Sequence, residues 1–232
     1  MKKPIPKTKL LQEVLATLPD LAEEVFEVPP DILAAVQAVP VAMTVTSDRT
    51  DVYLEIGTKR TFAAALGWPG WCRSGRDEAA ALETLLEYAP RYARVLRQAR
   101  LGFRAPKDAS QFVIRERLAG NATTDFGAPD MPTAHDSDPI DDAELRRFQA
   151  VLKAGWRTFD VAVAAAQGKQ LRTGPRGGGR ELDQIVHHLL ESDAAYLARL
   201  GVRLKFAEGG DPQQELGRTR QAILQALSSA SS

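Results

Sequence analysis

Residues 51–66 read DVYLEIGTKRTFAAAL, and this stretch decides how the fold begins. The runs 51–57 and 60–66 are short, mostly apolar, and separated by a turn at Gly57-Thr58-Lys59. Two such runs around a short turn predict a β-hairpin. The next residues, 68–75, are rich in turn formers and predict a third short strand.

A helix is predicted directly after the third strand. Asp77 is a typical N-cap residue, and Glu78 places a negative charge in the first turn. The apolar residues that follow recur on one helical face. Pro90 predicts a kink or break near Tyr88, because proline removes a backbone donor. A partial alternation over 111–118 predicts a further strand.

The second half of the chain is predicted to be helical. Residues 120–142 contain six aspartates and no lysine or arginine, which indicates a loop or linker. Beyond it, the segments 143–166, 181–200 and 212–227 each carry an apolar stripe. In the segment 181–200 the predicted stripe consists of Ile185, His188, Leu189, Ser192, Tyr196 and Leu200.

These patterns predict an α+β fold, with a small antiparallel sheet and its packed helix followed by an up-down helical bundle. The expected parts are a helical extension over 1–42, an α/β module over 43–120, an acidic linker over 121–141 and the bundle over 142–232. Met43 is an alternative start for the chain.

Composition restricts the class of protein. The 232 residues are 44% hydrophobic and 26% charged, as in ordinary globular proteins. The 30 basic and 30 acidic residues cancel, so the overall charge will not attract nucleic acid or an anionic membrane. Cys72 is the single cysteine, which suits a reducing compartment, and no run approaches the roughly 20 apolar residues of a membrane span. We expect a soluble, cytoplasmic protein.

Residues 69–82, PGWCRSGRDEAAAL, resemble the HicB-like module over roughly 51–98. That family pairs a strand hairpin with a Pro-Gly turn, a second glycine five residues on and an Ala/Leu-bearing helix. The resemblance implies an antitoxin-like protein that binds an RNA-cleaving partner. HicB proteins usually carry a separate DNA-binding segment, and no helix-turn-helix or ribbon-helix-helix pattern follows here.

Residues 181–200, ELDQIVHHLLESDAAYLARL, follow a helix with Trp156 and Phe159 and look like the second helix of the DinB family. The resemblance covers roughly 141–227. DinB proteins are bacterial four-helix bundles, many of which hold a divalent metal and act as thiol-dependent transferases, isomerases or hydrolases. The resemblance implies that His188 takes the place of the first metal histidine and Asp193 that of an acidic residue five positions later. The family's remaining histidines come from a later helix, whereas no histidine follows His188 and the bundle is about one helix short.

The candidate metal ligands therefore lie on one helix. A catalytic metal usually needs about three protein ligands. His188 and Glu191, or His187 and Glu191, lie within one helical turn and could supply two ligands to zinc or nickel. His135 or a second subunit could supply another. In the alternative interpretation, His188 packs in a helix interface and His187 faces solvent.

A glycine-rich segment before the same helix is a candidate anion site. Residues 171–180 read LRTGPRGGGR, so flexible backbone donors and three arginines precede a helix N-terminus. The candidate anion-binding residues are Arg172, Arg176 and Arg180. A plain connection between two helices is the alternative explanation of this segment, and it is the favoured one.

Arginines at every third position form the main basic stretch, which consists of Arg91, Arg94, Arg97 and Arg100. They could meet a phosphate backbone or an acidic partner. They also lie near a predicted helix C-terminus, where the helix dipole favours cations. Aromatic residues for base stacking are not interleaved with them, which argues against nucleic acid.

Two hypotheses about function follow. The first is a non-catalytic protein with a degenerate DinB-like bundle, which binds a protein partner or a small ligand without a cofactor and forms a homodimer. The second is a DinB-like metal-dependent transferase or hydrolase whose site centres on His188.

Overall fold

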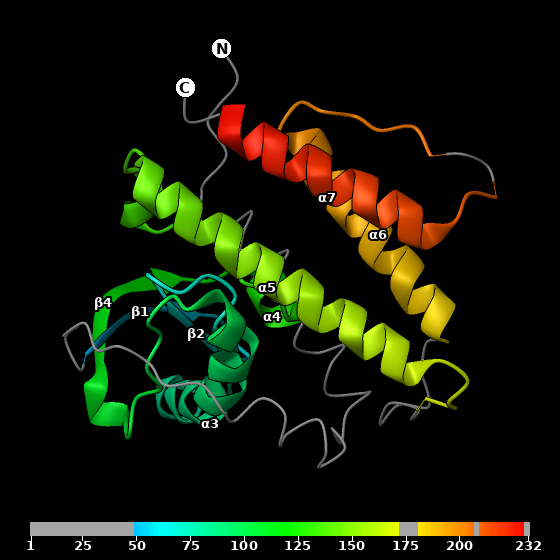
Figure 1. Cartoon of the computed structure of the whole chain (residues 1–232). Helices are drawn as coiled ribbons and strands as arrows, with labels where there is room; N and C mark the ends of the chain where they lie inside the picture. The colour runs from blue at the N-terminus through cyan, green and yellow to red at the C-terminus, as the bar shows by residue number, and fades with distance from the viewer. Residues whose placement is uncertain (1–48, 172–180, 207–208, 230–232) are drawn as a thin grey trace.

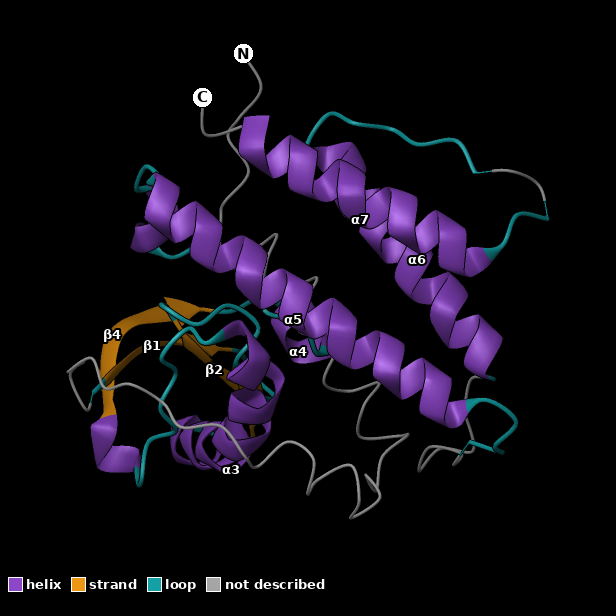
Figure 2. Ribbon diagram, in the orientation of Figure 1, coloured by secondary structure: helices purple, strands orange, loops and turns teal. Residues whose placement is uncertain are grey.

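The computed structural model describes residues 49–171, 181–206 and 209–229, and its fold is mixed α+β (Figure 1). The strands and one long helix gather on one side of the molecule, and the helices of the C-terminal half lie on the other (Figure 2). The α+β class predicted from the sequence is confirmed. Three predictions fall outside the described residues. They are the helical extension over 1–42, the alternative start at Met43, and the anion site formed by Arg172, Arg176 and Arg180.

The sheet contains β1 (Thr50–Ile56), β2 (Thr61–Ala65), β3 (Cys72–Gly75) and β4 (Phe112–Ala119), in the order β3-β2-β1-β4. The pairs β1–β2 and β2–β3 are antiparallel, so the predicted hairpin and third strand are confirmed. β4 was also predicted, but it pairs with β1 in the parallel direction. The prediction of an antiparallel sheet is therefore wrong at this edge, because the chain crosses the sheet through a helix before it enters β4.

That helix is α3 (Glu78–Leu96), which packs against β2 and β3. Oδ1 of Asp77 accepts a hydrogen bond from the backbone N–H of Ala80 at 2.8 Å, which confirms the predicted N-cap. The α-helix continues through Pro90 to its last residue, so no break occurs near Tyr88.

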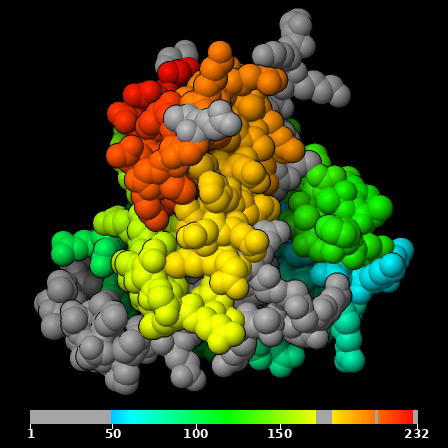
Figure 3. Space-filling model, turned by 90° about the vertical axis from the view of Figure 1, so that its right-hand side faces the viewer, coloured from blue at the N-terminus to red at the C-terminus, as the bar shows by residue number. Residues whose placement is uncertain are grey.

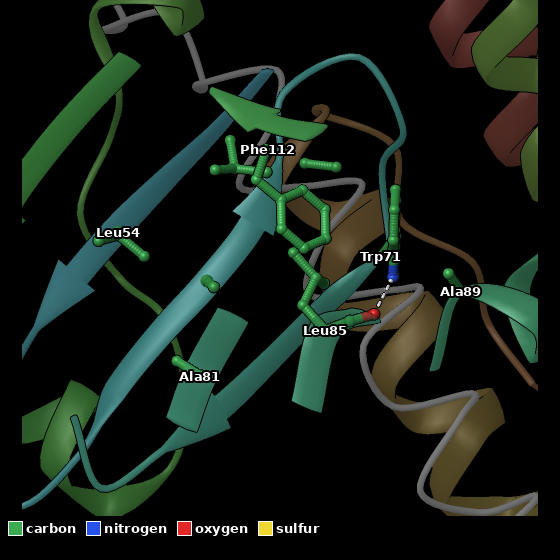
Figure 4. Packing of buried hydrophobic residues seen from close by; sticks show 9 residues of the cluster. Leu54, Trp71, Ala81, Leu85, Ala89 and Phe112 are labelled. Atoms are coloured by element: carbon green, nitrogen blue, oxygen red, sulfur yellow. Dashed lines mark hydrogen bonds between the residues drawn. The ribbon is translucent and has the colours of Figure 1, made fainter. Parts of the chain in front are cut away.

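The core of the sheet part lies between the sheet and α3. Small residues of α3, among them Ala81 and Ala89, allow the helix to approach the strand residue Leu54 closely (Figure 4). Trp71 is 2% exposed, and its indole N–H donates to the backbone carbonyl of Leu85 at 2.9 Å. This bond satisfies the indole nitrogen inside an otherwise apolar core.

The turn between β3 and α3 requires a glycine. A Cβ atom at Gly75 would lie 2.3 Å from the backbone nitrogen of Ala81 and 2.4 Å from the carbonyl carbon of Ala80. These neighbours are backbone atoms of the helix start and cannot move aside. The second glycine of the motif at 69–82 is thus explained by the close approach of strand and helix.

A buried carboxylate on β1 fastens the acidic segment to the sheet. Glu55 is fully buried, and its side chain accepts hydrogen bonds from the hydroxyl of Thr124 and from the backbone N–H groups of Asp130 and Met131. The segment also forms the short helices α4 (Ala122–Phe126) and η3 (Ala134–Ser137). Residues 120–137 therefore lie folded against β1 rather than extended between two parts.

The helical part contains α5 (Asp142–Ala166), α6 (Leu182–Arg199) and α7 (Pro212–Ser229), which confirms the segments predicted from the sequence. In Figure 1, α5 lies between the sheet part and the pair α6–α7. Leu96 of α3 belongs to one hydrophobic cluster with Leu152 of α5 and Leu197 of α6. The sheet part and the helical part therefore share a core.

The helices α6 and α7 run in the same direction (Figure 1). Leu189 of α6 packs in one cluster with Leu216 of α7, and Leu197 of α6 packs in another with Ile223 of α7. Residue numbers therefore increase in the same direction along both helices. The described connecting residues 200–206 lead back along the helices to make this possible (Figure 1). The predicted up-down connectivity is therefore wrong for this pair, although α5 and α6 are antiparallel.

Within the described ranges, no helix combines the length and the apolar composition needed to cross a membrane.

The substitution Glu55→Gln should destabilise the protein strongly. The amide keeps the shape of the side chain but turns a donor group toward backbone N–H groups, so charge-assisted hydrogen bonds are lost. We expect a loss of roughly 2–3 kcal/mol in the free energy of unfolding. Urea denaturation followed by circular dichroism measures it. The exposed Glu87→Gln on α3 is the control, and equal stability of the two variants would contradict the anchoring role of Glu55.

Candidate functional site

The interior of the helical part consists of two apolar clusters with polar groups between them. One cluster contains Leu152, Leu197 and Ile223, and the other contains Leu189 and Leu216. Between them lie four polar residues, which we call the polar layer. Its members are Asp160 on α5, Asp193 on α6, and Thr219 and Arg220 on α7.

Asp193 occupies a position where the helix pattern requires an apolar residue. It lies four residues after Leu189 and four before Leu197, both of which are buried in the clusters. Its side chain is 0% exposed, and neither carboxylate oxygen has a hydrogen-bond partner. A buried carboxylate without donors is costly to ionise. Burial accordingly raises the pKa of Asp193 to about 7, against the opposing effect of the positive charge on Arg220.

Arg220 is the cation of the polar layer, and its guanidinium is only partly used. Nη1 donates to both carboxylate oxygens of Asp160, at 2.9 and 2.8 Å. Nε and Nη2 are buried and have no acceptor. The guanidinium carbon lies 5.5 Å from the ring centroid of Trp156, a cation–π distance. Arg220 is thus close enough to influence the pKa of Asp193 without forming a hydrogen bond to it.

Trp156 adds another unused donor at the edge of the layer. Its side chain is buried in the cluster with Leu152, and its indole nitrogen Nε1 has no acceptor. Thr219, in contrast, is satisfied, because its hydroxyl donates to the backbone carbonyl of Glu215 at 2.8 Å. Trp156, Asp193 and Arg220 therefore hold three buried donor atoms and two buried acceptor atoms that lack partners.

The predicted metal ligands lie on the outer side of α6. His187 and Glu191 are exposed and His188 is half-buried. In the described part of the chain, no group of three or more His, Cys, Asp or Glu side chains is arranged to hold a metal ion. A zinc or nickel site at His188, Glu191 or His187 stays a prediction, because ligands from a second subunit lie outside a single chain.

His135 lies in η3, ahead of α5, and its imidazole is engaged there. Its Nδ1 atom is 2.9 Å from Oδ2 of Asp138, and its Nε2 atom is 3.7 Å from Oε1 of Glu144. Both carboxylates belong to the segment that leads into α5 or to its first turn. The structure therefore places this imidazole with these two carboxylates and does not bring it together with His188 in a metal-binding group.

The arginine stretch lies at the end of α3, as predicted. Arg91 is half-buried on the helix, and Arg94, Arg97 and Arg100 are exposed in its last turn and just beyond it. Arg100 adopts a left-handed backbone conformation, with φ of 51°, which ends the helical path. This placement fits the helix-dipole explanation. A role of the stretch in binding nucleic acid or an acidic partner stays a prediction.

The DinB-like resemblance singled out Asp193, but the polar layer was not predicted from the sequence, because the apolar stripe of α6 was placed incorrectly. The buried residues of α6 are Ile185, Val186, Leu189, Leu190, Asp193 and Leu197. The predicted stripe included His188, Ser192 and Tyr196 instead. The predicted buried face was therefore rotated about the helix axis by about one residue relative to the observed one. The signal that could have found the site is Asp193 itself, a carboxylate at four-residue spacing between two leucines.

Figure 3 shows α6 and α7 side by side on one face of the molecule. Comparisons of the chain with protein-family models, with curated proteins and with solved structures find no match. The HicB-like and DinB-like resemblances therefore stay predictions.

Protonation of Asp193 should make the stability of the protein depend on pH. The pKa in the folded state is about 7 and the ordinary value is 3.8, so the folded state binds the proton more tightly. This contribution is fully present below pH 4 and is lost as the pH rises to about 7. At about 1.4 kcal/mol for each tenfold change in proton affinity, it amounts to roughly 4 kcal/mol.

The variant Asp193→Asn tests this linkage because it cannot titrate. We expect the free energy of unfolding of the wild type, relative to this variant, to fall between pH 4.5 and pH 8. The exposed Asp183→Asn on the same helix is the control. Parallel pH profiles for the wild type and Asp193→Asn would show that Asp193 has an ordinary pKa.

Proposed function

We propose that this chain is a non-catalytic binding protein whose degenerate DinB-like helical part takes a small polar ligand at the polar layer. The observation that carries the proposal is Asp193, a fully buried carboxylate with no donor to either oxygen. Native proteins pair nearly all buried polar groups, and unpaired ones indicate a missing water, ion or ligand. The buried, unpaired nitrogens of Arg220 and Trp156 support the same conclusion.

The surroundings of Asp193 suit binding better than catalysis. The layer lies between two apolar clusters, so water is largely excluded and hydrogen bonds to a ligand are strong. Polar groups converge there from three helices, which fixes the orientation of a bound molecule. Nucleophilic catalysis needs a nucleophile beside a base, and the layer offers only the hydroxyl of Thr219, which is hydrogen-bonded to its own helix.

A metal-dependent transferase or hydrolase centred on His188 is the second candidate. The observation that favours it is the position of His188, half-buried on the same helix as Asp193, with the exposed His187 and Glu191 nearby. These side chains would form one wall of a site that a second copy of the chain completes. Zinc or nickel would act there by polarising a substrate oxygen or an attacking water.

Native mass spectrometry distinguishes the two candidates. The full chain, purified without a histidine tag, should carry a non-covalent organic ligand that Asp193→Leu removes and Asp183→Asn retains. Metal analysis of the same samples should show no stoichiometric zinc or nickel, and His188→Ala should leave the mass that the ligand adds to the protein unchanged. Stoichiometric metal that disappears in His188→Ala would support the enzyme and overturn our proposal.

A further inference from the structure

The unpaired atoms of the polar layer are of two opposite kinds. Arg220 contributes the donors Nε and Nη2, and Trp156 contributes the donor Nε1. Asp193 contributes two acceptor oxygens. The side chains of Arg220 and Asp193 are 13% and 0% exposed, so bulk water satisfies neither group fully. A molecule that satisfies the layer must therefore present acceptors toward Arg220 and Trp156 and donors toward Asp193.

Charge narrows the choice of the donor group. Arg220 is hydrogen-bonded to Asp160 through Nη1, so its charge is shared between two carboxylates and no hydrogen bond joins it to Asp193. A cationic donor, such as an ammonium group, supplies both the counter-charge and the hydrogen bonds. The guanidinium still has two N–H groups on its other side, and their geometry suits the two oxygens of a carboxylate.

We propose that the polar layer binds a small zwitterion of the α-amino acid type, with its ammonium group on Asp193 and its carboxylate on Arg220 and Trp156. This inference rests on the proposed function and specifies its ligand. A simple anion would leave Asp193 unpaired and add like-charge repulsion. A simple amine would leave the donors of Arg220 and Trp156 unpaired.

The apolar clusters on either side of the layer indicate the rest of the ligand. Leu197 and Ile223 flank the layer on one side, and Leu189 and Leu216 flank it on the other. A side chain that extends from the zwitterion enters one of these clusters, so it should be short and apolar. Charged and strongly polar amino acids would bury another group without a partner and are excluded.

The test uses the dialysed full chain, with isothermal titration calorimetry and thermal unfolding as readouts. The probes are glycine, L-alanine and L-leucine, and L-glutamate is the polar comparison. We expect at least one apolar amino acid to bind and to raise the Tm in proportion to its concentration. L-Leucine without its ammonium group is 4-methylpentanoate, and without its carboxylate it is 3-methylbutylamine. If L-leucine is the amino acid bound, each partial analogue should bind at least tenfold more weakly; for L-alanine the matching analogues are propanoate and ethylamine.

Variants assign the two ends of the ligand. Asp193→Asn should weaken binding of the amino acid at least tenfold, whereas binding of the carboxylate analogue should not weaken, because the like-charge repulsion is removed. Arg220→Lys should weaken binding of the amino acid while binding of the amine analogue is unchanged. Asp183→Asn is the matched control and should bind like the wild type. Circular dichroism shows whether each variant is folded, and the wild-type comparison of analogues needs no variant.

The outcomes separate this inference from the proposed function. If no amino acid binds but another organic ligand co-purifies and is lost in Asp193→Leu, the assignment of a zwitterionic ligand is wrong and the proposed binding function stands. If no amino acid binds and no ligand co-purifies, internal water fills the layer and both proposals fail. Equal binding of an amino acid and its carboxylate analogue would also overturn the assignment of Asp193.

Discussion

Helix α5 is packed on both sides, and the arrangement of the described elements depends on this packing. One side of α5 contacts α3 and the short helix η1 (Arg97–Ala99), and the other contacts α6 and α7. Leu96 of α3 and Leu197 of α6 meet Leu152 of α5 in one apolar cluster. Burial of this surface, which stabilises by about 25 cal/mol for each Å², fixes the sheet relative to the helices. The polar layer is therefore built on a rigid base.

Much of the fold could be predicted because its local signals are strong. The turn at 57–59, the N-cap Asp77 and the three apolar stripes after residue 142 each depend on neighbouring residues, and the structure contains all the elements they predict. Two of the errors concern long-range topology. The direction of β4 and the direction of α7 depend on how connecting segments cross the molecule, and no local pattern records that path.

The candidate site was harder to predict because its meaning depends on neighbours distant in sequence. Glu55 and Asp193 are both fully buried carboxylates within apolar stretches. Glu55 is satisfied by Thr124 and by backbone N–H groups about 70 residues away, so it anchors structure. Neither carboxylate oxygen of Asp193 has a donor, and the guanidinium of Arg220 that acts on it is hydrogen-bonded to Asp160. The sequence alone distinguishes neither case, because the donors come from other elements.

The burial of Asp193 makes the packing of the helical part a step that takes up a proton. In the unfolded chain the carboxyl group of Asp193 is hydrated and has the acidity of an ordinary aspartate. When the helices pack, that water is removed, and near neutral pH the carboxyl group takes up a proton from solution unless a cation reaches it first. A cation that binds Asp193 therefore competes with the proton for the same oxygens.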